Sequence, residues 1–175
     1  VPGAGTEVPI WLLGSSLFSA RLAAHKGLPY AFASHFAPRL LQAALAVYRQ
    51  EFRPSRVLAQ PWVMVGVPVI AAPTDAEAEY LASSTYQRVL GIITGRRGLL
   101  APPVHDFMAQ LGEAERMAIA DFLALAVIGV PDTLRAGLAA IHEATQADEF
   151  MMVCDIFDAD LRLRSLDITA QALAV

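Results

Sequence analysis

The stretch WLLGSSLFSARLAAHKGLPYAFAS, Trp11 to Ser34, decides the fold of this chain. It contains a short apolar run, a Gly-Ser-Ser turn, a helix-forming segment and a second apolar run. Continuous apolar runs bounded by turn residues are typical of strands that are buried on both faces. We therefore expect a strand, a helix and a second strand that runs parallel to the first.

Gly14, Ser15 and Ser16 occupy the junction between the first strand and the helix. In parallel α/β folds this junction binds anions, because free backbone N–H groups and the positive end of the helix dipole point to the same place. The three residues also suit a plain turn with Ser16 as the N-cap, so both interpretations remain open. Ser19 lies one turn inside the helix, and its hydroxyl either faces the loop mouth or bonds back to the preceding turn.

Apolar runs and helical patterns alternate along the rest of the chain. Ser16 and Gly27 suit the start and the stop of the first helix, and Thr74 to Glu77 forms a capping box before the third. The expected strands are Val8 to Leu13, Leu28 to Ser34, Trp62 to Ala72 and Phe150 to Asp155. The expected helices run approximately from Leu17 to Lys26, Pro38 to Phe52, Thr74 to Ile93, Glu113 to Leu125, Pro131 to Thr145 and Asp158 to Leu173.

Pro68 stands in the middle of the third expected strand. A proline cannot donate a hydrogen bond to a neighbouring strand, so it is rare in the middle of a sheet. We therefore expect a bulge or a locally unpaired edge at this position.

Four strands that alternate with helices require parallel pairing through right-handed crossovers. An open doubly wound sheet fits poorly, because no glycine fingerprint follows the first strand. A (β/α)₈ barrel needs about 250 residues, so four units and an insertion in 175 residues suit half a barrel. The open edges and the apolar concave face of such a half also suit a hydrophobic content of 55%. We expect one α/β domain over residues 1–175, a parallel half of a TIM barrel.

Composition excludes several classes of function. A net charge of −4, with no basic cluster larger than Arg96-Arg97, argues against nucleic acid as a partner. The richest apolar run, Phe122 to Val130, is too short to cross a bilayer, so we expect no membrane span. A single cysteine suits the reducing cytoplasm, where we expect the protein to reside. The opening VPGAGTE lacks the features of a signal peptide and is typical of a linker within a longer protein.

Few residues qualify as candidate catalytic groups or ligands. His25, His105 and His142 have no partners at metal-ligand spacing, so we expect no metal site and a structural role for all three. Cys154 lies in an apolar strand and is expected to be a core residue. His35 follows the second strand at the carboxyl end, where barrel sites gather, so it either lines the pocket or bonds to backbone.

Five segments in their joint order and spacing resemble the carboxyl-terminal half of the bacterial-luciferase-like, flavin-dependent monooxygenases. They are WLLGSSLFSARLAAHKGLPYAFASHF, YRQEFRPS, WVMVGVPVIAAPTDAEAEYLA, IGVPDTLRAGL and DEFMMVCDIFDADLRLRSL, and the resemblance runs from about Pro9 to Ala170. It implies a TIM-barrel enzyme that binds reduced FMN and uses molecular oxygen on a small organic substrate. This chain would supply strands five to eight, with extra helices before the last. The loop after the fifth strand holds the flavin phosphate in that family, which matches Ser15, Ser16 and Ser19 here.

The family's amino-terminal half is absent from this sequence, and with it the early-strand histidine and acidic residues that lie near the flavin ring in family members. No residue of this chain is therefore assigned to catalysis. We expect a luciferase-like monooxygenase or its carboxyl-terminal fragment, with Gly14, Ser15, Ser16, Ser19 and His35 as the cofactor-binding residues. The expected partner is a second copy of the chain or the missing half. Two alternatives are a non-catalytic flavin-binding or assembly module that dimerises, and a relative that uses a deazaflavin.

Overall fold

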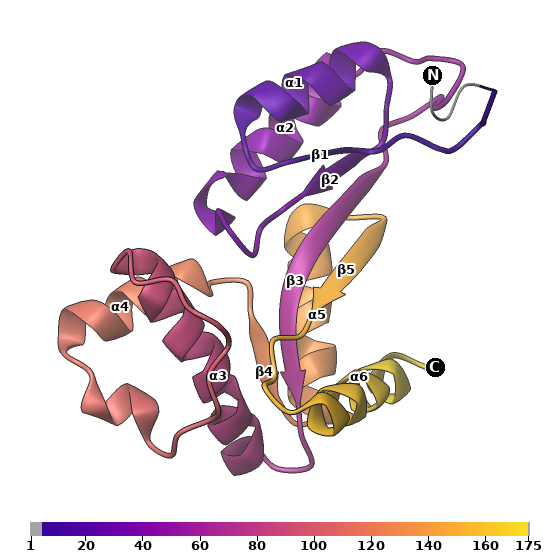
Figure 1. Cartoon of the computed structure of the whole chain (residues 1–175). Coiled ribbons are helices and arrows are strands. Elements are labelled where there is room, and N and C mark those ends of the chain that lie inside the picture. The colour runs from indigo at the N-terminus through magenta and orange to yellow at the C-terminus, as the bar shows by residue number, and fades with distance from the viewer. Residues whose placement is uncertain (1–4, 175) are drawn as a thin grey trace.

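The computed structural model describes residues 5–174 and shows a parallel α/β fold (Figure 1). The elements in this part of the chain are, in order, β1 (Leu12–Gly14), α1 (Leu17–Lys26), β2 (Tyr30–Phe32), the 3₁₀ helix η1 (Pro38–Leu40), α2 (Leu41–Glu51), β3 (Val63–Ala71), α3 (Asp75–Ile93), η2 (Phe107–Gln110), α4 (Glu113–Phe122), β4 (Val127–Gly129), α5 (Pro131–Thr145), β5 (Glu149–Val153) and α6 (Ala159–Leu173). No helix among them is both long and apolar enough to span a bilayer.

Strand β3 is the centre of the sheet, and every strand pairing within residues 5–174 is parallel. β1 pairs with β2, and β2 pairs with the first half of β3, where Phe32 lies opposite Val65. β5 pairs with β3 through a register that ends with Val153 opposite Pro68. The four expected strands therefore lie side by side in sequential order, and the expected parallel α/β fold is confirmed.

One of the five strands, β4, was not expected from the sequence. The segment after α4 was expected to remain helical to about Leu125, whereas the helix ends at Phe122 and Val127–Gly129 pairs with residues 69–71 of β3. A three-residue apolar run carries no periodicity that separates a strand from the end of a buried helix. Pairing with the far end of β3 decides the matter, because it satisfies backbone groups that the shorter neighbouring strands leave open.

The unpaired edge expected at Pro68 is confirmed. The carbonyl of Trp62 accepts a hydrogen bond from β2, and the N–H of Ala72 donates one to Gly129 of β4. The backbone groups of even-numbered residues in β3 therefore point to the edge that carries β2 and β4. Pro68 lies between these two partners, at residues that pair only with β5 on the opposite edge. Its missing N–H therefore breaks no hydrogen bond.

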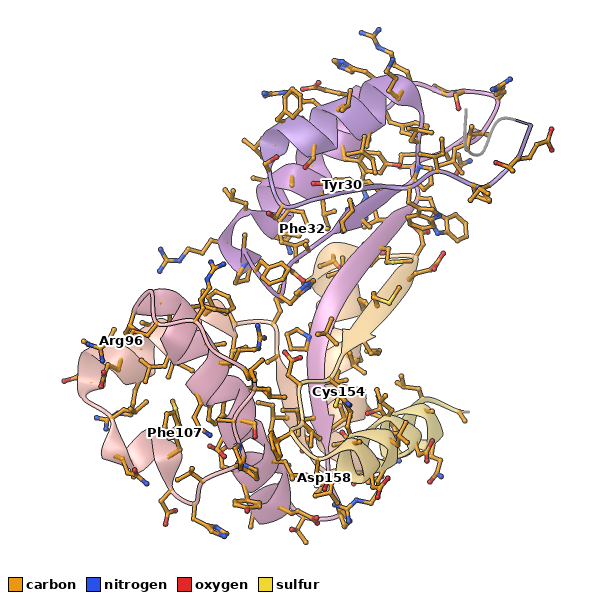
Figure 2. All side chains as sticks on the ribbon, in the orientation of Figure 1. Tyr30, Phe32, Arg96, Phe107, Cys154 and Asp158 are labelled. Carbon is orange, nitrogen blue, oxygen red and sulfur yellow. The ribbon has the colours of Figure 1, made fainter. Side chains whose placement is uncertain are left out.

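Two apolar clusters form the core: the first contains the odd-numbered residues 63–71 of β3, and the second contains Ile70 near its end. The first joins the first half of the sheet to α1, α2 and α5, and Tyr30, Phe32 and Tyr48 are its largest side chains. The second joins the end of β3 to α3, α4 and α6. Figure 2 shows Tyr30 and Phe32 in the part of the molecule built by β1, β2, α1 and α2, and Phe107 beside α3 in the other part.

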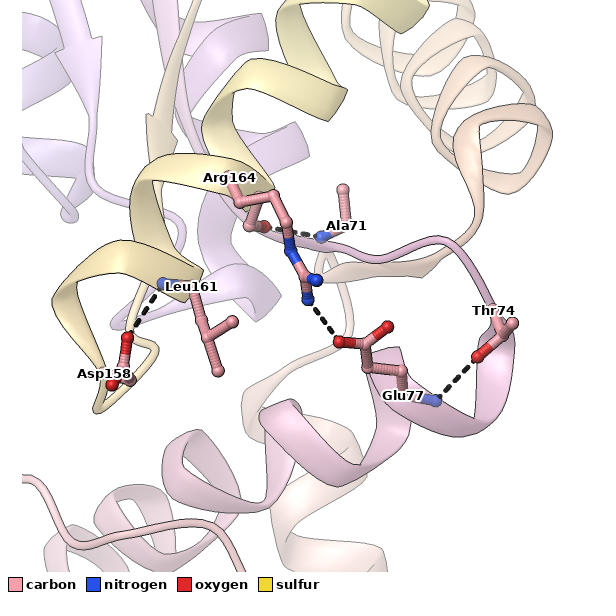
Figure 3. A network of polar contacts seen from close by, with 7 residues as sticks. Ala71, Thr74, Glu77, Asp158, Leu161 and Arg164 are labelled. Carbon is pink, nitrogen blue, oxygen red and sulfur yellow. Dashed lines mark hydrogen bonds and ion pairs between the residues drawn. The ribbon is translucent and has the colours of Figure 1, made fainter.

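Local capping signals set the helix boundaries. Helix α1 begins after Ser16, whose Oγ accepts the Ser19 N–H, and ends at Gly27, whose φ of 60° is left-handed, as expected. The hydroxyl of Thr74 and the carboxylate of Asp158 cap α3 and α6 (Figure 3). Only half of the expected capping box at Thr74 forms, because the Glu77 carboxylate pairs instead with Arg164 of α6.

Candidate functional site

One face of the first half of the sheet is covered by helices and the other is open. Side chains alternate across a strand, so Leu12, Tyr30, Val63 and Val65 point into the first core cluster while their neighbours point the opposite way. The open face is formed by side chains such as Leu13 and Met151, which are 69% and 54% exposed, and by Met64.

A hollow of about 420 Å³ lies on this face, and we call it the open-face hollow. Its walls are almost entirely apolar, and His35 is its titratable residue. A site of this size is within the range of small-molecule pockets, which are mostly apolar with few polar groups. The main lining residues are Trp11, Leu13, Met64, Met151, His35 and Gly66.

The amino terminus of α1 lies at the carboxyl end of β1, as expected. Ser16 and Ser19 form a reciprocal capping box, and the Ser19 hydroxyl also donates to the Ser16 carbonyl at 2.8 Å and lies 3.0 Å from the Tyr30 hydroxyl. Ser19 is buried, so of the two roles considered for its hydroxyl the structure shows the bond back to the preceding turn. The hydroxyl of Ser15 takes no part in this network.

Gly14 is required by this arrangement, because a Cβ atom at position 14 would lie only 2.3 Å from the Ser19 Oγ. The next N–H groups of the helix, those of Leu17 and Phe18, have no acceptor among the described residues. Two backbone donors therefore remain available at the positive end of α1, beside the half-buried Ser15. Such a helix terminus suits an anion, and a phosphate group is a good example.

His35 lies in the turn after β2 and lines the open-face hollow. Its Nδ1 is buried and has no hydrogen-bond partner among the described residues. Burial lowers the pKa of His35, the nearby Arg88 lowers it further, and Asp155 acts in the opposite direction. A proton on Nδ1 would be buried without an acceptor, so the neutral tautomer with its proton on Nε2 is favoured.

Arg88 and Asp155 form an ion pair near His35, with 2.6 Å between Nη2 and Oδ2. Arg88 belongs to α3, and Asp155 follows the carboxyl end of β5. Arg88 could not be singled out from the sequence, because one arginine on an amphipathic helix resembles any other. Asp155 belongs to the last expected strand, and its carboxylate pairs with Arg88.

The remaining singled-out residues have structural partners. His25 pairs with Glu51, the ring of His105 stacks on Tyr80, and His142 Nδ1 lies 3.1 Å from the Ala147 carbonyl. Cys154 is half-buried beside Ser165, and burial raises the pKa of its thiol. Within residues 5–174, no group of three or more His, Cys, Asp and Glu side chains is placed to hold a metal ion.

Comparison with known proteins identifies relatives that are about twice as long. The chain is 45% identical over 170 residues to the uncharacterized protein YvbT of Bacillus subtilis, covering 97% of this chain and 51% of that protein. It is 42% identical over 168 residues to a luciferase-like monooxygenase of Escherichia coli K12, covering 96% of this chain and 50% of that protein. The chain thus spans about half the length of the curated relatives it matches.

Solved structures share the fold of this chain. The crystal structure of apo-MsnO8 matches 98% of this chain and 56% of its own, with a TM-score of 0.75 and 32% identity. The oxygenating constituent of 3,6-diketocamphane monooxygenase from Pseudomonas putida, solved with FMN, shares the fold at a TM-score of 0.61 and 22% identity, over 99% of this chain and 51% of its own. A coenzyme F420-dependent reductase of Methanopyrus kandleri also shares the fold, with a TM-score of 0.60 and 14% identity, over 98% of this chain and 51% of its own.

The model of one protein family, described as luciferase-like monooxygenase, matches residues 1–148. This match includes β1 to β4, the α1 amino terminus and His35, and therefore most of the candidate site. The chain belongs to the luciferase-like monooxygenase family.

Proposed function

We propose that this chain is the carboxyl-terminal half, strands five to eight, of a (β/α)₈ barrel enzyme that binds reduced FMN and oxidises a small organic substrate with molecular oxygen. Family membership, the half-length match to the relatives and the parallel sheet with one open apolar face support this proposal. β4 and the helices around it are the insertion before the last barrel strand. The amino-terminal half of the barrel then covers the open face.

The observation that carries the proposal is the amino terminus of α1, where Gly14 has no space for a side chain and two N–H groups lack acceptors among residues 5–174. These residues fit the phosphate of FMN: the N–H groups of Leu17 and Phe18 and the hydroxyl of Ser15 hold it, while Ser16 and Ser19 keep the helix terminus in place. Each charge-assisted hydrogen bond contributes roughly 1.5 to 3 kcal/mol. When bound, FMN supplies the redox chemistry.

The open-face hollow and His35 form the second part of the proposed site. Apolar walls exclude water from the reacting groups, which is the protein's main share in this chemistry. His35 is neutral at neutral pH and carries its proton on Nε2, so it donates a hydrogen bond to a carbonyl or similar acceptor of the cofactor or substrate. Because His35 is neutral, this hydrogen bond orients the acceptor without adding a charge to the open-face hollow.

A deazaflavin cofactor is the second candidate, because a coenzyme F420-dependent enzyme shares the fold at nearly the same TM-score as the FMN complex. Both cofactors carry a phosphate that α1 could hold, so this half of the barrel accommodates either. The two are distinguished by titrating the full-length protein with FMN and with F420 separately, using quenching of cofactor fluorescence.

The decisive experiment compares Ser16→Asp with Ser16→Asn in the full-length protein. Asp and Asn are both good N-cap residues, so each variant keeps α1 capped, but only Asp places a negative charge beside the phosphate. We expect Ser16→Asp to abolish FMN binding, Ser16→Asn to retain it, and Ser15→Ala to weaken it modestly. Equal FMN affinity for the Asp and Asn variants would show that the phosphate lies elsewhere.

A further inference from the structure

A second and larger hollow, of about 570 Å³, lies between the turn after β2 and helices α3 and α4. It shares no lining residue with the open-face hollow or with the α1 terminus, and we call it the arginine hollow. Its volume is within the usual range for small-molecule sites. Its lining residues are Phe36, Arg88, Ile92, Arg97, Gly98 and Phe122.

The charge in the arginine hollow is positive. Asp155 neutralises Arg88 through one nitrogen, but the Nε of Arg88 is buried and has no partner among the described residues. Arg97 is exposed, and no ion pair or side-chain hydrogen bond joins it to another residue within 5–174. Asp121 lines a neighbouring hollow that shares Phe36 and Phe122 with this one, and its carboxylate is paired with Arg39. A guanidinium is thus left available in a concave wall.

The other walls are apolar and partly aromatic. Phe36 is 56% exposed, and Phe122 and Ile92 are half-buried. Exposed rings in a hollow offer flat contact area to a flat ligand, while the planar fork of an arginine matches both oxygens of a carboxylate. The Phe36 ring also lies 4.1 Å from the ring of His35, so the arginine hollow meets the open-face hollow at this pair of side chains.

We propose that the arginine hollow binds a flat apolar acid, an aromatic or cyclic molecule that carries a carboxylate. The carboxylate pairs with Arg97 in the field of Arg88, and the ring lies against Phe36 and Phe122. Within the proposed function this is the class of the organic substrate, and that assignment rests on the proposed function. The binding itself rests only on the geometry and charge of the hollow.

The test is a titration of the full-length protein with 2-naphthoate and with its neutral isostere 2-naphthamide, followed by calorimetry and by the amide resonance of Gly98. Arg97→Gln removes the proposed carboxylate partner. Arg96→Gln is the matched control, because it removes the same charge from the adjacent position, which does not line the hollow. A charged hydrogen bond of about 1.5 kcal/mol corresponds to roughly a tenfold change in affinity.

We expect 2-naphthoate to bind more tightly than 2-naphthamide and to shift the Gly98 resonance. Arg97→Gln should weaken 2-naphthoate about tenfold and leave 2-naphthamide unchanged, while Arg96→Gln should change neither by more than about twofold. Equal weakening by both variants, or equal affinity for the acid and the amide, overturns the proposal. FMN titration of the same proteins separates acid binding in the arginine hollow from the proposed function, because Arg97→Gln should leave FMN affinity unchanged. If the wild type does not bind FMN, this result counts only against the proposed function.

Discussion

At the scale of single residues, Gly66 determines where His35 can lie. A Cβ atom at position 66 would be 2.7 Å from the Nδ1 of His35, closer than real contacts of this kind. The buried Nδ1 is therefore packed against the bare backbone of β3, a position from which it finds no hydrogen-bond partner among the described residues. The glycine in the strand has a packing role that its neighbours in the sequence do not reveal.

Gly66→Ala should displace the imidazole and lower the free energy of unfolding by about 1 to 3 kcal/mol, the usual cost of overpacking. Gly98→Ala is the control, because a Cβ there meets no atom within 4 Å. Urea denaturation measures both. If the two substitutions cost the same, the contact between Gly66 and His35 does not constrain the structure.

The charge state of His35 gives the next prediction. Its pKa is lowered in the folded protein, mainly by burial, so below about pH 6.5 the unfolded chain binds more protons than the folded one. The contribution of His35 is fully present above that pH and is lost as pH falls through the folded pKa. His35→Gln should therefore reduce the loss of unfolding free energy between about pH 7.5 and pH 5. A ¹⁵N NMR titration that places the His35 pKa at or above 6.5 would contradict this account.

At the scale of elements, sequence signals succeed where they are local. Ser16 and Gly27 fix both ends of α1 to the residue, since a cap and a left-handed stop need only their own neighbours. The same is true of the Gly14-Ser15-Ser16 turn, so this part of the candidate site could be predicted. β4 could not, because it is too short for periodicity and depends on the far end of β3. The ion pair of Arg88 with Asp155 was missed because it joins elements that only the tertiary fold brings together.

The end of β3 depends on α6 in the same way. The Ser165 hydroxyl, which is fully buried, accepts the Ala71 N–H at 2.8 Å on the edge of β3 that carries β5, beyond the last residue that pairs with β5. Ser165→Ala leaves this N–H buried without an acceptor, so we expect a loss of about 1 to 3 kcal/mol in denaturant unfolding. Thr169→Val is the control, because the Thr169 hydroxyl bonds only to the preceding turn of its own helix. If the two variants lose comparable free energy of unfolding, the hydrogen bond between Ser165 and the sheet does not contribute to stability.

At the scale of the whole molecule, helices cover only one face of the first half of the sheet. The hydrophobic content and the expected half-barrel architecture predicted an open apolar face, but the sequence could not determine which parity of side chains forms it. The pleat assigns Leu13, Met64 and Met151 to the open side and Val65 to the core. A face of this kind usually lies against another protein surface, which in the proposed function is the amino-terminal half of the barrel.

The last prediction follows from that face. When residues 1–175 are produced alone, none of the described residues covers Leu13 and Met151, so we expect self-association at micromolar concentration in sedimentation velocity experiments. The double substitution Leu13→Glu and Met151→Glu places charges on the open face and should yield a monomer. Phe18→Glu is the matched control: Phe18 is 75% exposed, but it lies on α1 and outside the lining of the open-face hollow, so it should leave the association intact. A monodisperse monomer before any substitution would show that this face is stable in water. If Phe18→Glu disperses the assembly as well as the double substitution does, the contact runs through α1 instead.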